Sequence, residues 1–410
     1  MARILILIGG HLWTSPRSQK EAAAWADGGH DVTIGGVWLE PRGAERDLLL
    51  SERQTWRFAP IVDLRDTHAP GLLRNRSVRL GYRLAREVYA FTGVVLPALF
   101  GYGVTALLHA ALEHRADLTI VHSEAGLWVG EQLLKRGQQV GVDFEDWFSE
   151  DLLPEARRQR PIARIRELES RLARECPYVL TTSRAMSDAM SAAYSCRPPT
   201  VVYNTFSDTA SQVDGKVKDR RDCGIPSLHW FSQNIGPGRG LEVLFRALAI
   251  LEQPFECHLR GAISRDSMNW LDGQLSPAVR RHVFTHDTVP TDQLLSRIAE
   301  HDVGLALETM RIRSRDLTIT NKVFQYLQAG LAVIATATTG QQEVLRESPD
   351  AGFLIEEGDP NALAECLGAL LRERDLLTRR KAAARRAFAQ QWAWERQLEG
   401  LQAAIAAAVA

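Results

Sequence analysis

The chain has 410 residues, of which 45% are hydrophobic and 24% are charged, and its net charge is -1. This length exceeds one ordinary core and predicts two domains, while the near-zero charge argues against nucleic acid as a partner. The 5 cysteines form no closely spaced pair, which disfavours a disulfide framework or zinc site and favours a reducing cytoplasm.

The first half of the chain alternates short apolar runs with longer amphipathic stretches, which is typical of strand–helix units on a parallel sheet. The first run, 4–8, is too short for a signal peptide and precedes a predicted helix at 17–26. Further strands are predicted at 31–37, 118–122, 139–143, 178–182 and 200–203.

Residues 207–226 interrupt this alternation of apolar and amphipathic segments, because they are polar, charged and poor in large apolar side chains. They are therefore predicted to form the linker between the domains. The Ala- and Arg-rich tail from residue 375 predicts one or two amphipathic helices. Strands of the second half are predicted at 227–232, 255–259, 283–286, 303–307, 332–335 and 353–355.

Two glycine-rich turns follow predicted strands. The turn at Gly9-Gly10 lacks the G-x-G-x-x-G pattern, so it gives little support for a dinucleotide site. It is either a tight turn or a loop whose amides approach ligand phosphates. In the turn at 236–240, Arg239 adds a permanent charge suited to phosphate, although a loop with one exposed arginine explains it equally well.

The stretch 317–330 carries the strongest signal for an anion site. A polar loop supplies Thr318, Thr320 and Asn321, and a helix is predicted to begin near Asn321. The free N–H groups at a helix start suit a pyrophosphate. Lys322 in the first turn is unfavourable unless an anion compensates its charge. The alternative is an ordinary helix capped by Thr320, with Lys322 solvated.

Four segments resemble family 4 glycosyltransferases of the GT-B fold. Arg239-Gly240-Leu241-Glu242 resembles the donor loop of that family. Asn321-Lys322 to Tyr326, with Ala329-Gly330 and 333–336, is similar to its N-K-x-x-E-Y-x-x-A-G-x-P-V-x-A-T block. The other two segments are the opening, with Ser15-Pro16-Arg17 and Gly29-His30-Asp31-Val32, and the stretch 143–151, which resembles D-x-H-E-x-F-S-E.

The resemblance implies an α/β protein with two Rossmann-like domains whose parallel sheets face each other across a cleft. Residues 1–206 would bind the acceptor, 207–390 the nucleotide-sugar donor, and the helix at 391–410 would return to the first domain. The implied reaction moves a sugar from a UDP- or GDP-sugar to a carbohydrate, lipid-linked or small-molecule acceptor, with retention of configuration. No cofactor is implied, with the nucleotide sugar acting as substrate.

No Asp-x-Asp pair occurs in the sequence, so no metal site is predicted, and Arg239, Lys322 and helix dipoles would stabilise the departing diphosphate. His122 lines up with a family histidine near the transferred sugar and completes the predicted catalytic set, although a structural histidine explains it nearly as well. The predicted donor-binding residues are Gln233, Gly238, Arg239, Thr318, Thr320, Asn321, Lys322 and Gln325. The predicted acceptor-side residues are Gly10, Arg17, Glu124, Asp143 and Glu145.

The sequence departs from the family at three positions. Leu317 and Gln325 stand where the family has the two carboxylates of an E-x7-E motif, and Gln233 replaces one phosphate-binding cation. Gln325 can still accept a hydrogen bond through its carbonyl, whereas Leu317 cannot. Leu317 and Gln325 keep open the alternative of a catalytically silent sugar- or partner-binding subunit. A nucleotide-sugar epimerase or hydrolase of the same fold is the other alternative.

Two neighbouring segments raise the question of a membrane. The arginines between 74 and 86 have no acid between them, which is typical of a surface for anionic lipid, a solvated helix face or an acceptor-binding face. Glycines and a proline interrupt the apolar run 88–112, so a buried helix pair or interfacial segment is favoured over a membrane span. We expect a cytoplasmic protein with possible peripheral contact at the inner face of a membrane.

Overall fold

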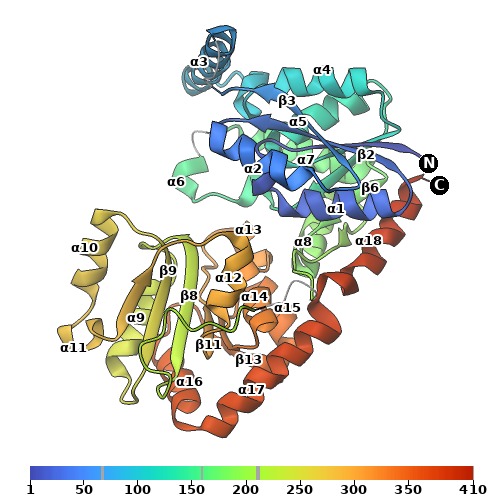
Figure 1. Cartoon of the computed structure of the whole chain (residues 1–410). Coiled ribbons are helices and arrows are strands. Elements are labelled where there is room, and N and C mark those ends of the chain that lie inside the picture. Colours follow the sequence, from blue (N-terminus) through green and yellow to red (C-terminus); the bar gives the residue numbers. More distant parts are fainter. Residues whose placement is uncertain (66–68, 158–159, 209–212, 410) are drawn as a thin grey trace. The chain divides into compact units, whose positions relative to one another are not determined.

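The computed structural model describes residues 1–65, 69–157, 160–208 and 213–409. Their contacts divide the chain into two compact units. The first unit is Met1–Val202 with Leu398–Ala410, and the second is Tyr203–Gln397. Each unit is a twisted parallel sheet with helices on both of its faces (Figure 1).

The first unit has a seven-stranded sheet in the order β3-β2-β1-β4-β5-β6-β7, with all pairs parallel. Its central strands are covered on both faces, which explains why they are continuous apolar runs rather than alternating ones. The strands are β1 (Arg3–Leu7), β2 (Asp31–Trp38), β3 (Arg57–Asp63), β4 (Leu118–Val121), β5 (Val140–Phe144), β6 (Tyr178–Thr181) and β7 (Thr200–Val201).

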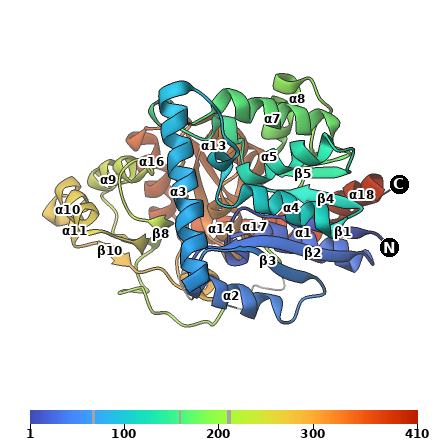
Figure 2. The ribbon, with the colours of Figure 1, turned by 90° about the horizontal axis from the view of Figure 1, so that it is seen from above.

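Helices connect these strands. They are α1 (Pro16–Asp27), α2 (Pro41–Ser51), α3 (Ala69–Thr92), α4 (Val104–His114), α5 (Ser123–Leu134), α6 (Pro154–Arg157), α7 (Ile162–Glu175) and α8 (Arg184–Tyr194), with short 3-10 turns η1 (Leu12–Thr14), η2 (Pro97–Phe100) and η3 (Phe148–Glu150). The longest, α3, is seen in full length with no element in front of it when the molecule is viewed from above (Figure 2).

The second unit has a six-stranded parallel sheet in the order β10-β9-β8-β11-β12-β13. Its strands are β8 (Ser227–Asn234), β9 (Glu256–Ala262), β10 (Val283–His286), β11 (Val303–Ala306), β12 (Ala332–Thr336) and β13 (Gly352–Ile355). Its helices are α9 (Leu241–Ile250), α10 (Arg265–Gln274), α11 (Pro277–Arg280), α12 (Thr291–Ile298), α13 (Arg313–Leu317), α14 (Asn321–Ala329), α15 (Thr339–Glu347), η4 (Pro349–Ala351), α16 (Pro360–Arg372), α17 (Arg374–Ala387) and the π-helical turn η5 (Phe388–Trp392). The last helix, α18 (Trp394–Val409), begins in this unit and belongs to the first unit from Leu398 onward.

A separate apolar core lies on each face of the second sheet. Residues of β11 alternate between them, with Leu305 in one core and Ala306 in the other. On the same face of β11 as Ala306, Gly304 has no side chain because the Tyr326 ring of α14 packs directly against it. A Cβ on Gly304 would come within 2.2 Å of that ring. The Tyr326 hydroxyl donates to the His229 carbonyl of β8 at 3.0 Å, which ties α14 to the sheet.

The prediction that residues 207–226 form a linker between the domains is wrong. By its contacts this segment belongs to the second unit, and the chain passes between the units at Val202 and Tyr203. In its described part, Asp214 pairs with Arg297 at 2.7 Å, and Glu300 accepts the Lys218 and Asp219 amides at 2.7 and 2.8 Å. The polar composition that suggested a linker therefore serves these hydrogen bonds.

The sequence patterns also missed β3 and α2. In β3 only Val62 is buried, because the strand lies at the edge of the sheet, and Pro60 within its short apolar run argues against a strand. Residues 88–112 form the end of α3, the η2 turn and most of α4. Within the described part of the chain, no helix is both long and apolar enough to cross a membrane.

We expect Gly304→Ala to lower the free energy of unfolding of the second unit by about 1–3 kcal/mol, because the new methyl group collides with a buried aromatic ring. Gly273→Ala on α10 is the matched control, since its added methyl group meets nothing within 4 Å. It should be neutral or slightly stabilising, because alanine is the better helix former. Urea unfolding measures both, and equal effects of the two variants would contradict the packing described.

Candidate active site

A buried network of charged residues lies where β4 and β5 end in the first unit. His122 follows β4 directly, and only 3% of its side chain is exposed. Its Nε2 lies 2.7 Å from a Glu21 oxygen, and its Nδ1 lies 2.8 Å from a Glu145 oxygen. Because carboxylates only accept hydrogen bonds, the imidazole has to carry both protons to donate to both of them.

These neighbours set the charge of His122. Burial alone lowers the pKa of a histidine, but the Glu21 and Glu145 carboxylates outweigh it and raise the pKa of His122 to about 10. The folded pKa thus lies above the unfolded one, so this network stabilises the fold at neutral pH, and its contribution is lost as the pH rises through about 10. Both ring nitrogens are occupied, and the role of His122 next to the transferred sugar stays a prediction.

Arg17 and Asp143 form a second pair beside this histidine. The Arg17 Nε donates to one Asp143 oxygen at 2.6 Å and Nη2 donates to the other at 3.0 Å, with both side chains almost fully buried. The Nη1 group donates to the Val202 carbonyl at 2.6 Å. Burial raises the pKa of Asp143, and the Arg17 charge opposes that shift. The fold therefore brings Arg17, Asp143 and Glu145 together with His122.

Sequence reasoning missed two members of the network. Glu21 accepts a 2.6 Å hydrogen bond from the Tyr178 hydroxyl in addition to its contact with His122. Glu21 lies four residues after Arg17 on α1, so both side chains share one face of that helix. Two ionisable residues on a buried helix face were the available signal, whereas no local pattern marks Tyr178.

Three residues of the network have the geometry of a cation site. Glu21, His122 and Asp143 offer ligand atoms that all lie within 4.8 Å of one another. Each is already satisfied, however, because His122 donates to two carboxylates and Asp143 holds the Arg17 guanidinium. A metal ion would have to displace both cationic partners, so the donor set fits the observed ion pairs better than it fits a metal.

The remaining acceptor-side residues lie in other surroundings. Glu124, in the first turn of α5, pairs with Arg160. Both line a cavity of about 500 Å³, together with Tyr82 and Arg86 of α3. Gly10 lies in the turn after β1, and its carbonyl accepts the Val37 amide of β2 at 2.9 Å. The Gly10 turn is therefore bonded to the neighbouring strand, and its amide stays a predicted ligand contact.

In the second unit, the glycine-rich loop connects β8 to α9. Arg239 is exposed and donates to the Ser232 hydroxyl at 3.0 Å, while the Gly238 amide donates to Glu242 at 2.7 Å. Gly240 has φ 78° and lies so close to Leu307 that a Cβ would be 2.4 Å from its carbonyl oxygen. Glycine is required there by both the positive φ and the close approach.

The helix α14 begins at Asn321, as predicted, and Lys322 lies in its first turn. The Lys322 Nζ is 2.5 Å from an oxygen of Glu308, which follows β11. Thr320 occupies the N-cap position, but its hydroxyl bonds to Glu308 rather than to the helix amides. Burial raises the pKa of Glu308, but Lys322 and this hydroxyl outweigh it and hold that pKa below its usual value.

Glu308 is thus the anion that compensates Lys322 in this structure, and sequence reasoning missed it. Its position directly after a buried strand was the available signal, since ligands of open α/β sheets bind at the carboxyl ends of strands. Of the other predicted donor residues, Gln325 is 6% exposed, Thr318 donates to the Ser314 carbonyl at 3.0 Å, and Gln233 and Asn321 are exposed.

Arg239 and Lys322 belong to the same edge of the second sheet. β8 and β11 are neighbours, Arg239 follows β8, and the Glu308 partner of Lys322 follows β11. The Lys322 Nζ also lies 5.9 Å from the centre of the Trp230 ring of β8. Two cations and a helix N-terminus at the carboxyl edge of adjacent parallel strands suit an anionic ligand.

Comparison with solved structures defines the class of the fold. A glycosyltransferase from Rickettsia africae ESF-5 has a TM-score of 0.68 at 12% identity, covering 99% of this chain and 98% of that one. Anabaena Alr3699/HepE in complex with UDP has a TM-score of 0.67 at 16% identity, covering 99% and 100%. WaaG, a glycosyltransferase involved in lipopolysaccharide biosynthesis, has a TM-score of 0.62 at 12% identity, covering 98% and 99%.

The chain accordingly has the GT-B fold of two Rossmann-like domains, as predicted. Residues 229–373 match the family described as glycosyl transferases, group 1, so the family match covers most of the second unit. No curated protein matches the chain in sequence. The second unit is therefore similar in sequence to group 1 glycosyl transferases, and the fold of the whole chain is the one that these solved glycosyltransferases have.

We expect Asp143→Asn to destabilise the protein by about 3–5 kcal/mol, because it removes the carboxylate that is hydrogen-bonded to the buried Arg17 guanidinium. The matched control is Asp31→Asn, which breaks an Arg57–Asp31 pair whose side chains are 67% and 38% exposed. An exposed pair contributes at most about 1 kcal/mol. Chemical unfolding of both variants measures the difference, and a small loss for Asp143→Asn would show that the pair does not support the fold.

Proposed function

We propose that the protein transfers a sugar from a UDP- or GDP-sugar to an acceptor, with retention of configuration and without a metal ion or cofactor. The observation that carries this proposal is the edge of β8 and β11, where Arg239, Lys322 and the start of α14 meet. Alr3699/HepE, whose fold the chain shares, was crystallised with UDP and with UDP-glucose, which supports a nucleoside diphosphate as the leaving group.

The start of α14 is the proposed seat of the diphosphate. The Thr320 hydroxyl turns to Glu308 and the Val323 amide donates to the Thr320 carbonyl, so the Asn321 and Lys322 amides are the ones left for a ligand. These amides and the helix dipole would bind phosphate oxygens, while Arg239 offers a planar fork of donors from the neighbouring loop. Such fixed positive groups stabilise the charge that develops on the departing diphosphate, which a metal ion supplies in other transferases.

The ion pair between Lys322 and Glu308 has a defined part in this proposal. The two side chains are 14% and 23% exposed, so a ligand can reach them. A diphosphate carries more charge than one carboxylate and would draw Lys322 away from Glu308. The released Glu308 carboxylate would then be free to accept sugar hydroxyls, a role that Leu317 cannot perform. Glu308 thereby replaces the carboxylate absent from position 317.

We expect Arg239→Ala and Lys322→Met each to weaken UDP or GDP binding about 10- to 100-fold, because a charge-assisted hydrogen bond contributes about 1.5–3 kcal/mol. Arg246→Ala is the matched control, since Arg246 is an exposed arginine on α9 that contacts only the helix. Calorimetric titration with each nucleotide, in the presence of EDTA, measures the affinities and tests metal independence together.

Nucleotide binding that survives both variants would contradict the proposed seat. The protein is then incubated with the UDP- or GDP-sugar alone, according to which nucleotide binds. This distinguishes a transferase from a hydrolase or epimerase, because the latter two consume the donor without an acceptor. The configuration of the product, read by NMR, tests retention. Binding without any turnover over a panel of sugar acceptors would favour a silent subunit.

We further propose that the acceptor is held at the face of an anionic membrane, through α3. Leu73, Leu80, Leu84 and Phe91 are 71%, 56%, 55% and 86% exposed. Offsets of 7, 11 and 18 residues return to nearly the same side of an α-helix, so these side chains form one apolar stripe. The buried residues Asn75 and Ala85 lie on the opposite side.

The positive charge of α3 favours an anionic membrane as its partner. Besides the stripe, α3 carries exposed arginines, each worth about 1 kcal/mol near an anionic membrane surface. The side chains of α3 also reach the cavity at Glu124, because Tyr82 and Arg86 line it. A lipid-linked acceptor anchored in that membrane could therefore present its head group there. The exposed arginines are Arg74, Arg76, Arg79, Arg83 and Arg86.

We expect the protein to sediment with phosphatidylglycerol vesicles and not with phosphatidylcholine vesicles. The double variant Leu80→Glu, Leu84→Glu should bind at least 10-fold more weakly, because burying one leucine contributes about 1.5–3 kcal/mol. Ile250→Glu, at a position on α9 that is 49% exposed, should bind like the unmodified protein. Equal binding of the stripe variant and the unmodified protein, or no binding at all, would refute the membrane contact.

A further inference from the structure

Three buried histidines and the half-buried His286 lie side by side in the second unit, outside the proposed donor site. His229, His258 and His286 come from β8, β9 and β10, and His301 precedes β11. The His229 and His301 rings stack at 4.6 Å, His301 and His258 lie 4.6 Å apart, and His258 and His286 stack at 5.2 Å. Any two of these neighbouring rings would repel each other if both were protonated.

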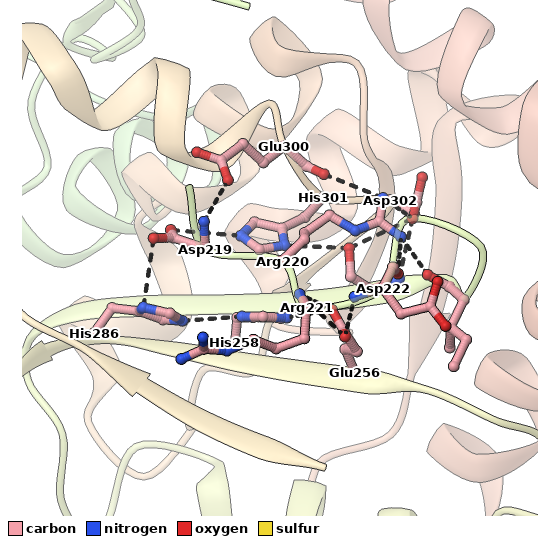
Figure 3. Close-up of polar contacts among 12 residues, drawn as sticks. Asp219, Arg220, Arg221, Asp222, Glu256, His258, His286, Glu300, His301 and Asp302 are labelled. Atoms are coloured by element: carbon pink, nitrogen blue, oxygen red, sulfur yellow. Dashed lines mark hydrogen bonds and ion pairs between the residues drawn. The ribbon is translucent and has the colours of Figure 1, made fainter. Parts of the chain in front are cut away.

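A hydrogen-bonded chain runs through two of these histidines (Figure 3). Glu256 lies 3.1 Å from His258 Nε2, and His258 Nδ1 lies 2.9 Å from His286 Nε2. His286 Nδ1 lies 3.4 Å from Asp219. Three contacts need three hydrogens, and two neutral imidazoles supply only two. The longest contact is the one between His286 and Asp219, where the hydrogen is missing.

Acid adds protons to the two histidines of this hydrogen-bonded chain in a fixed order. A first proton at His286 Nδ1 completes the contact with Asp219. A second proton has to go to His258 Nδ1, which already accepts from His286 Nε2. Two N–H groups would then face each other at 2.9 Å, and two charged rings would stack. The hydrogen bonds that run from Glu256 to Asp219 therefore persist when one proton is added, and a second added proton breaks them.

Asp219 belongs to a segment that we call the strap, residues 213–226, which runs directly into β8. Polar contacts hold the strap to the unit, since its Val213 and Val217 side chains are 46% and 55% exposed. The Arg221 and Asp222 amides donate to Glu256 at 3.2 and 2.7 Å. Both ends of the histidine chain, Glu256 and Asp219, are thus also anchors of the strap (Figure 3).

Further charged groups surround the cluster. Arg260 of β9 pairs with Asp219, and Glu300, after α12, accepts the Lys218 and Asp219 amides. Arg220 of the strap pairs with Asp302, which also binds Lys381 of α17. Arg221 lies over the Phe284 ring of β10. Cations therefore face the histidines from β9 and from the strap, and they oppose any added positive charge.

The shifts of the four imidazoles agree with this geometry. Burial lowers the pKa of His258 to about 4 despite the opposing effect of Glu256, and it lowers that of His286 despite Asp219. Burial and the neighbouring cations hold the pKa of His229 and His301 well below the usual value. Because each folded pKa lies below the unfolded 6.5, this part of the fold is fully stable above pH 6.5 and loses stability as the pH falls towards about 4.

We propose that the histidine cluster and the strap form an acid-operated latch, in which the second proton taken up by the His258–His286 pair releases the strap from the second unit. The strap is continuous with β8, the strand that leads to Gln233 and Arg239. Release would therefore free the amino end of the strand whose other end carries the proposed donor loop. The latch itself stands whether or not that loop binds a nucleotide.

Cys223, an exposed residue within the strap, provides the test. With Cys196→Ser and Cys366→Ser in place, the remaining thiols are the buried Cys176 and Cys257, so a fluorophore attaches to Cys223. We expect its anisotropy to fall steeply between about pH 6.5 and pH 4, with a Hill slope near 2, before tryptophan fluorescence reports unfolding. Replacing His258 and His286 by Gln should keep the strap bound about one pH unit further into acid.

His109→Gln, at an exposed histidine of α4, is the control and should leave the transition unchanged. A label that stays immobile until the whole protein unfolds would overturn the proposal, and so would release of the glutamine variant at the unmodified pH. If the glutamine variant has a loose strap even at pH 8, NMR of the unmodified protein decides. The His258 and His286 signals should then titrate at the pH of strap release, and titration at another pH refutes the latch.

Discussion

Parallel strands bring all their carboxyl ends to one edge of a sheet, and charged residues at that edge need partners. In the first unit, Arg17 pairs with Asp143 and His122 pairs with Glu21, and all four side chains are almost fully buried. In the second unit, Lys322 pairs with Glu308 at the start of α14. Because an unpaired buried charge costs several kcal/mol, these pairs fix how helices α1 and α14 sit on their sheets.

The ion pairs at the two sheet edges differ in how easily a ligand can displace one of their partners. His122 and Glu21 are 3% and 2% exposed, so their pair is part of the framework. Lys322 and Glu308 are 14% and 23% exposed, and exposed Arg239 stands on the neighbouring loop. A ligand with more negative charge than a carboxylate can compete for Lys322 only where solvent reaches it. This contrast explains why we assign anion chemistry to the second unit and positioning to the buried network of the first.

The sequence predicted much of the fold because buried parallel strands are continuous apolar runs, and β1, β4 and β12 are such runs. It missed β3, whose short apolar run contains Pro60, and it misread 207–226, whose polar residues bond to their own domain. Lys322 at a helix start was detectable from local charge alone. Its partner Glu308 is 14 residues away, and Glu21 is 101 residues from His122, so only the folded chain reveals those pairings.

We propose that Lys322 exchanges Glu308 for a diphosphate at the start of α14. A crystal structure of the protein with bound UDP or GDP tests this most directly. We expect phosphate oxygens within hydrogen-bonding distance of the first α14 amides, Lys322 and Arg239, with Lys322 moved away from Glu308. A nucleotide bound elsewhere, or one bound while the Lys322–Glu308 pair stays at its present 2.5 Å, would contradict it.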